Sequence, residues 1–143
     1  MISTLRFVLV LALFCVVTLA GSFAAESTSP IGLWQTPRGF VRVYETDGKF
    51  FGKIERSVTP GDETRICTAC KDERKDQPII GLVIMRNVRF IDGRYEDGDI
   101  LDATSGSVYR CRFSLEEGGT VLIMRGFIGV ALLGKSVSWQ RAE

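Results

Sequence analysis

Apolar and polar side chains alternate over much of the sequence, which is the pattern of β-strands that are buried on one face. The alternation is clearest in residues 107–115, where the odd-numbered residues from Tyr109 to Leu115 are apolar and arginine and serine stand between them. After the first 24 residues, no stretch has the apolar spacing of a helix. We therefore expect an all-β domain of antiparallel strands.

Turn signals divide the alternating segments into strands. Asp47-Gly48 and Asp92-Gly93 each separate two such segments, and Asp-Gly pairs favour tight hairpins because glycine readily adopts positive φ. Glycine also marks the connections at residues 104–106 and 117–119. The expected strands, about eight in number, are residues 31–36, 40–46, 49–58, 79–91 with a bend near Arg86-Asn87, 94–102, 107–115, 120–128 and 135–141.

Eight short antiparallel strands predict a closed up-and-down barrel, which leaves no sheet edge exposed. A two-sheet sandwich is the alternative, but its crossovers need longer connections than the second half of the chain offers. The one long connection, residues 59–78, holds Pro, Gly and many charges. Loops of this length are usually functional or mobile, and we expect a short helical turn within this one at residues 71–76.

The first 24 residues differ from the rest of the chain. Arg6 precedes an apolar run from Phe7 to Ala20, and small residues follow at Ser22 and Ala24. This is the order of a secretory signal peptide, and as a helix the run would rise only about 21 Å, which is short of a bilayer core of about 30 Å. We expect a signal peptide at residues 1–24, a polar tether at 25–30 and one barrel domain at 31–143.

Charge and composition exclude several functions. The sequence has 18 Lys+Arg, 17 Asp+Glu and no His, and loss of Arg6 with the signal peptide would leave equal numbers of basic and acidic residues. A neutral chain has no overall attraction to nucleic acid, so we expect no nucleic-acid partner, and no membrane span in the mature chain. Without His, catalytic triads and His-ligated zinc are excluded, and we expect no metal, cofactor or catalytic residue.

Two of the four cysteines lie close together in the long connection, at Cys67 and Cys70. A zinc site would need two further ligands, and a redox site would need a helix that starts at the first cysteine. We therefore expect a local disulfide between them. Alternation places Cys111 on the apolar face of its strand, where a small buried side chain is expected, although pairing of Cys111 with either other cysteine stays open.

Four stretches of sequence carry a resemblance to a known family: PIGLW at residues 30–34, FGKI at 51–54, KDQPIIGL at 75–82, and RGFIGVALLG at 125–134 followed by Trp139. They resemble the bacterial family of exported proteins known as domain of unknown function 2147. The resemblance implies a small lipocalin-like barrel of the bacterial envelope or extracellular space, without established catalytic residues. Lipocalin-type barrels carry Gly-x-Trp on the first strand and an arginine on the last strand that packs across the tryptophan. Gly32, Trp34 and Arg141 occupy matching positions, so we expect structural roles for them.

The segment 127–134 is a long apolar connection before the last strand. We expect it to plug the end of the barrel, with an exposed apolar lip at the mouth as the alternative. Arg125 shares a strand face with Ile123 and Phe127, so its charge needs a partner, either a ligand inside the barrel or a structural ion pair. The candidate ligand-binding residues are Trp34, Phe113, Arg125, Phe127 and Trp139.

A barrel without a catalytic pair favours binding over reaction. We expect an exported, periplasmic or secreted barrel that binds a small apolar or amphipathic molecule in its cavity. One alternative is an envelope interaction module with a packed interior that binds a protein partner. A less favoured alternative is a thiol–disulfide enzyme that uses Cys67 and Cys70.

Overall fold

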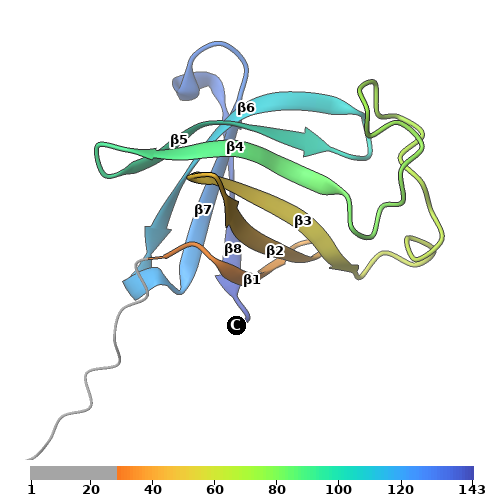
Figure 1. Ribbon diagram of the computed structural model, residues 1–143, viewed down its shortest axis with the longest axis horizontal. Coiled ribbons are helices and arrows are strands. Elements are labelled where there is room, and N and C mark those ends of the chain that lie inside the picture. Colours follow the sequence, from red (N-terminus) through yellow and green to blue (C-terminus); the bar gives the residue numbers. More distant parts are fainter. Residues whose placement is uncertain (1–28) are drawn as a thin grey trace, which may run out of the picture.

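The protein forms a closed barrel of eight antiparallel strands, in which each strand pairs with its neighbours in the chain and β1 pairs with β8 (Figure 1). The predicted fold class is confirmed. The computed structural model describes residues 29–143, so the predicted signal peptide and residues 25–28 of the predicted tether lie outside the described residues. The elements are β1 (Gly32–Thr36), β2 (Gly39–Thr46), β3 (Lys49–Ser57), β4 (Val83–Ile91), β5 (Arg94–Asp102), β6 (Ser107–Glu116), η1 (Glu117–Gly119), β7 (Val121–Phe127), η2 (Ala131–Leu133) and β8 (Lys135–Arg141).

The strands follow the predicted boundaries with two exceptions in the long β3–β4 connection. Residues 79–82, expected as the start of a strand, form a turn in which Gly81 has a φ of 90°. Residues 71–76, expected as a helical turn, form bends and turns without a helix. The bend predicted in β4 is present, because Asn87 has a φ of 60° and the pairing of β3 with β4 changes register beside it.

The main core fills the part of the barrel nearest the chain ends, where inward side chains from all eight strands meet. Its fully buried members include Trp34, Val43, Val88 and Leu122. A second, smaller apolar cluster lies beneath the β3–β4 connection and joins Cys67, Cys70, Ile79, Leu82 and Leu101. This second cluster explains why residues 79–82 turn away from the sheet, since Ile79 and Leu82 are buried under the loop.

Arg141 closes the end of the barrel at which the chain enters and leaves. Its guanidinium lies 4.3 Å from the ring centroid of Trp34, as the resemblance implied. The guanidinium also donates hydrogen bonds to the carbonyl oxygens of Gly119 at 2.7 Å, Ile31 at 3.0 Å and Ser29 at 2.6 Å. The Trp34 indole donates to the carbonyl oxygen of the buried Pro30 at 2.8 Å. The last two residues of the predicted tether are therefore held against the barrel.

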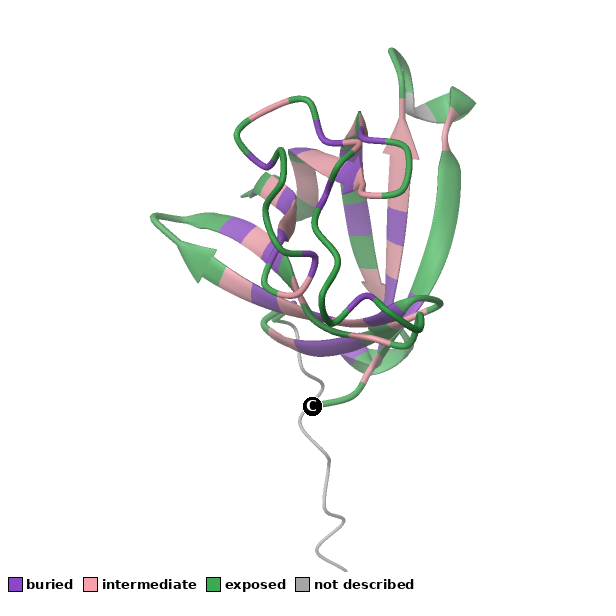
Figure 2. Cartoon of the chain, turned by 90° about the vertical axis from the view of Figure 1, so that its right-hand side faces the viewer, coloured by how far each residue is buried: buried purple, intermediate pink, exposed green. Residues whose placement is uncertain are grey.

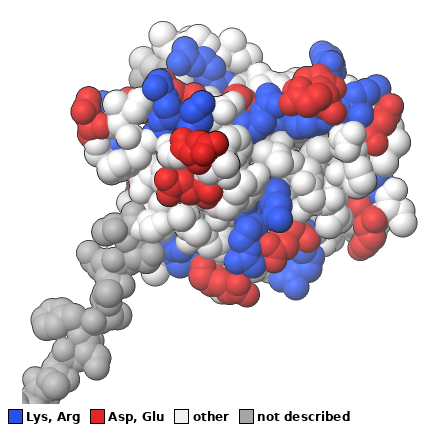
Figure 3. Space-filling model, viewed as in Figure 1, with Lys and Arg blue, Asp and Glu red and all other residues white. Residues whose placement is uncertain are grey.

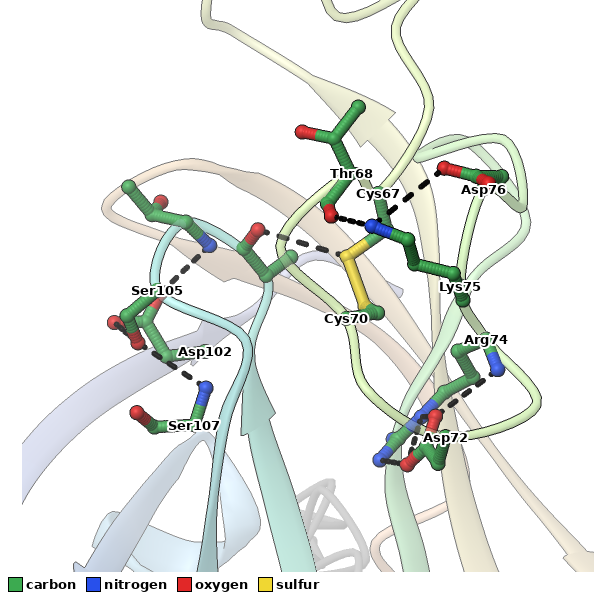
Figure 4. Close-up of a disulfide and its surroundings, with 12 residues drawn as sticks. Cys67, Thr68, Cys70, Asp72, Arg74, Lys75, Asp76, Asp102, Ser105 and Ser107 are labelled. Atoms are coloured by element: carbon green, nitrogen blue, oxygen red, sulfur yellow. Dashed lines mark hydrogen bonds and ion pairs between the residues drawn. A yellow bond between two sulfur atoms is a disulfide. The ribbon is translucent and has the colours of Figure 1, made fainter.

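A disulfide joins Cys67 to Cys70 in the β3–β4 connection, as predicted, and Cys111 is free and buried. The connection packs closely on the β5–β6 turn (Figure 4), because Cys67 Sγ lies 3.7 Å from the Ala103 carbonyl oxygen. Gly106 has a φ of 72°, and a Cβ there would come within 1.8 Å of the Ala69 carbonyl oxygen. The long connection, which lies in front of the barrel in Figure 2, is thus fixed to the sheet at its middle.

Candidate functional site

The barrel is hollow at the end opposite Arg141, where β1, β3, β5 and β7 finish. A cavity of about 620 Å³ opens at this end, and every strand contributes to its lining. We call it the mouth cavity. Its walls are mainly apolar and include Val41, Ile54, Ile84, Ile100, Met124 and Val137, with Trp139 at the inner end.

Two neighbouring positions on β8 show how the cavity ends. Val137 pairs with Met124 across β7 and β8, so its side chain points into the barrel, yet it is 45% exposed. Trp139, two residues further along the same face, is only 4% exposed and belongs to the main core. Solvent therefore reaches the inner wall at Val137, and Trp139 forms the floor of the mouth cavity. Gly126 adds to the space, because a Cβ there would reach the side chains of Ile100 and Tyr109.

The rim of the mouth cavity carries four cationic side chains, of which two form ion pairs with a carboxylate and two do not. Arg38 pairs with Asp102 at 3.6 Å, and Arg65 pairs with Asp62 at 3.1 Å. Within residues 29–143, Arg56 and Lys135 have no carboxylate oxygen within 4.0 Å. Arg56 instead lies 4.1 Å from the centroid of the Phe40 ring.

Lys135 is the cation whose placement is most informative. It pairs with Gly126 and stands on the same strand face as Val137 and Trp139, so it belongs to the inner face of the barrel at its rim. Alternation from Trp139 backwards would have found Lys135 in the sequence. Alternation could not have found Arg56, because the pairing of β2 with β3 shifts register between Phe40 and Val41.

Of the five sequence-predicted binding residues, Trp139 forms the floor of the mouth cavity, and Phe127 borders its rim from the outer face of β7, where its ring lies 5.9 Å from the Arg110 guanidinium. Trp34 is buried beneath Arg141, away from the cavity. Phe113 is buried in the main core and stacks on Tyr95, with ring centroids 4.5 Å apart. Both residues have packing roles in this structure.

The prediction of Arg125 as a polar anchor inside the barrel is wrong. Met124 belongs to the main core, so Arg125 points to the outer face of β7. There its guanidinium donates to Ser136 Oγ at 3.0 Å and to the Leu132 carbonyl oxygen at 3.0 Å. The error has a physical cause: residues 121–124 are apolar on both strand faces, so alternation does not tell which face is internal.

The β7–β8 connection does not plug the barrel, and the expected alternative, an apolar lip at the mouth, is what the structure has. Four of its apolar side chains are exposed: Ile128 by 73%, Val130 by 60%, Leu132 by 86% and Leu133 by 78%. We call these four residues the apolar tip, and Figure 2 shows the connection projecting from the barrel. The connection folds back over the end of β7, where a Cβ on Gly134 would come within 2.4 Å of the Gly126 carbonyl oxygen.

A second hollow, a groove of about 840 Å³, lies over β5, β6 and β7 near η1. Charged side chains such as Arg94, Arg112 and Glu116 line much of it. The mouth cavity is the better candidate site although it is smaller, because an apolar ligand gains most from walls that exclude water.

A family comparison agrees with the resemblance seen in the sequence. Residues 32–141, from β1 to β8, match the family model described as "Uncharacterized protein conserved in bacteria (DUF2147)". The chain belongs to this family. The family match covers the complete barrel, so the mouth cavity and the apolar tip both lie within the matched segment.

A solved structure supports the fold. Protein HP1028 from Helicobacter pylori, described as belonging to the lipocalin family, superposes with a TM-score of 0.72 at 19% sequence identity. The superposition covers 82% of this chain and 85% of that one. The architecture is therefore lipocalin-like. No match was found among curated protein sequences, and within residues 29–143 no helix has the length and apolar character to span a bilayer.

Proposed function

We propose that this protein is an exported, non-enzymatic binding protein that holds a small amphipathic molecule in the mouth cavity. One observation carries the proposal: an apolar hollow of about 620 Å³ whose floor is Trp139 and whose rim is charged. Ligand pockets are commonly about 300–1,000 Å³ in volume, with apolar walls and a few polar groups that fix orientation. The buried disulfide and the predicted signal peptide support a site of action in the periplasm or outside the cell.

The rim favours a ligand with a negative end. Lys135 stands on the inner face above Val137, and within the described residues it has no carboxylate partner. Arg56 likewise has no carboxylate partner within the described residues. A ligand whose chain lies against Val137 and Trp139 would place an anionic head near Lys135. A long-chain carboxylate has this chemistry.

The alternatives considered from the sequence have less support. A packed interior does not fit a barrel whose inner wall is solvent-exposed at Val137. A thiol–disulfide enzyme needs sulfur atoms that a partner thiolate can reach. Cys67 and Cys70 are both buried against Ile79 and Leu101, which favours a structural bridge.

The test is a titration of the exported chain with dodecanoate and with 1-dodecanol by calorimetry. Saturable binding is expected, and Val137→Trp should weaken it by about tenfold or more, since the new side chain fills the cavity. Val108→Trp is the matched control, because Val108 is 46% exposed on the outer face of β6. Absence of saturable binding, or equal affinity of the two variants, would contradict the proposal.

Two further variants test separately how the protein recognises the ligand's head group and its hydrocarbon chain. Lys135→Gln should weaken the binding of dodecanoate and leave that of 1-dodecanol unchanged, since only the carboxylate interacts with the ammonium group. Ligand should also change the fluorescence of Trp139, and Trp139→Phe should remove that change, because the other tryptophan, Trp34, is buried at the closed end. Equal losses for both ligands with Lys135→Gln would show that the rim does not recognise the head.

A further inference from the structure

The apolar tip is exposed in a way that folding alone does not explain. Its four large side chains, Ile128, Val130, Leu132 and Leu133, follow one another within six residues and are each at least 60% exposed. Single exposed apolar residues are normal on soluble proteins, whereas a cluster rimmed by polar groups marks a contact with another apolar phase or surface. The tip therefore has the character of a contact surface.

Along the sequence, the charged residues on either side of the tip are all cations. Residues 118–142 contain no Asp or Glu but include Arg125, Lys135 and Arg141. Two of these cations flank the tip: the Arg125 guanidinium donates to the carbonyl oxygen of Leu132, and Lys135 opens the strand that follows η2. The tip forms the mainly white top of Figure 3, with Lys or Arg atoms beside it. The chain is close to neutral as a whole, so this hairpin concentrates positive charge beside apolar side chains.

We propose that the apolar tip docks on the surface of a bilayer that contains anionic lipids. Two interactions hold peripheral proteins on membranes. Apolar side chains enter the boundary between head groups and acyl chains, and flanking cations reach the lipid phosphates. Leu132 and Leu133 are the most exposed members and enter the boundary. Arg125 and Lys135 meet the lipid phosphates.

Charge complementarity selects this partner over a second copy of the chain. Two copies that met tip to tip would bring their Arg125 and Lys135 side chains together, and like charges repel. An anionic bilayer supplies both the apolar phase and the opposite charge. A further relation supports the assignment: Ile128 and Leu133 also line the mouth cavity, so a docked barrel opens its cavity towards the lipid.

The experiment is co-sedimentation of the exported chain with vesicles of phosphatidylcholine alone and with vesicles that also contain phosphatidylglycerol. We expect binding to the anionic vesicles that weakens as salt is added. The double variant Leu132→Ser/Leu133→Ser should lose about tenfold or more in apparent affinity. Ile31→Ser is the matched control, since Ile31 is 46% exposed at the opposite end of the barrel.

The substituted tip side chains are exposed, so thermal unfolding should show that the double variant remains folded. Wild-type protein that stays in the supernatant with both vesicles, or a double variant that binds as well as wild type, would overturn the proposal. If the wild-type protein self-associates without binding vesicles, and the double variant abolishes that self-association, the tip contacts a second copy of the chain instead. Val137→Trp should retain vesicle binding, so failure of ligand binding and failure of membrane docking are distinguishable.

Discussion

Gly98 on β5 lies directly opposite Cys111 on β6, and a Cβ at position 98 would come within 3.1 Å of Cys111 Sγ. The thiol is enclosed in the main core, and burial raises its pKa from 9.0 to about 12, with a smaller contribution from the charge of Asp99. Thiolates, not thiols, are the reactive species. The sole free cysteine of the described chain is therefore protected by both packing and protonation.

We expect Cys111 in the folded protein to resist a disulfide reagent such as Ellman's reagent at about pH 8 and to react promptly in denaturant. Rapid labelling of the native thiol would contradict the prediction.

The burial of Cys111 also makes the stability of the protein depend on pH. Because the folded pKa is raised, the unfolded thiol ionises first, and the free energy of unfolding should fall as pH rises from 9.0 towards about 12. Cys111→Ala should remove this component, measured as the difference between the two pH profiles.

Gly98→Ala should lower the free energy of unfolding by about 1–3 kcal/mol or more, because the added methyl group overpacks the core. A Cβ there would come within 2.2 Å of Val88 Cγ2 and 2.9 Å of the Arg86 carbonyl oxygen. Gly126→Ala is the control, since its nearest neighbour would be Ile100 Cγ2 at 3.4 Å. Urea unfolding of both variants measures the difference, and equal stabilities would show that β5 can move to accept the methyl group.

Arg141→Gln should destabilise the barrel by about 2–4 kcal/mol, because it removes the stacking on Trp34 and hydrogen bonds to three backbone carbonyls. Arg141→Lys should recover only a part, since an ammonium group cannot donate in the same fork geometry. Arg112→Gln, on the exposed face of β6, serves as the control and should change little. Denaturant midpoints and slopes give the values, and full recovery by lysine would reduce the role of Arg141 to its charge.

The β3–β4 connection should lose stability in acid through Asp72. The hydrogen bonds from the Arg74 side chain lower the pKa of Asp72 from 3.8 to about 2, helped by a backbone hydrogen bond and the charge of Arg86. A lowered pKa gives stability that is complete above 3.8 and is lost as pH falls towards about 2. Hydrogen exchange of the amides near Cys67 should report the loss, and Asp72→Asn should remove its pH dependence. An unchanged pH profile in that variant would assign the acid sensitivity to another carboxylate.

Much of the architecture could be predicted because it depends on local signals. The alternation in β6, the Asp-Gly turns at 47–48 and 92–93, and the Trp34–Arg141 pair each follow from residues that lie on one strand, in one turn or in a known motif. The Cys67–Cys70 disulfide was likewise expected from spacing and compartment.

The candidate site was harder to predict, because it depends on how much volume the inward side chains of eight strands leave unfilled. Alternation in β7 is ambiguous, since Leu122 and Met124 face inward while the equally apolar Val121 and Ile123 do not. The position of the apolar tip depends on the path of the backbone after Phe127, which hydrophobicity alone does not determine. Apolar character favoured a plug over a lip, and the exposed side chains of the connection show a lip instead.

The contact between Arg141 and Trp34 marks the closed end of the barrel, and a protein attached to a surface at that end would have a defined orientation. Residue 143 and the described start of the chain at Ser29 lie on the same side of the barrel, and the mouth cavity opens on the opposite side. A sensor chip or a fluorescent protein attached after residue 143 would leave the mouth and the apolar tip facing the solution. Every immobilised copy would then present the same face, so vesicles and dissolved ligands could be compared on one oriented layer.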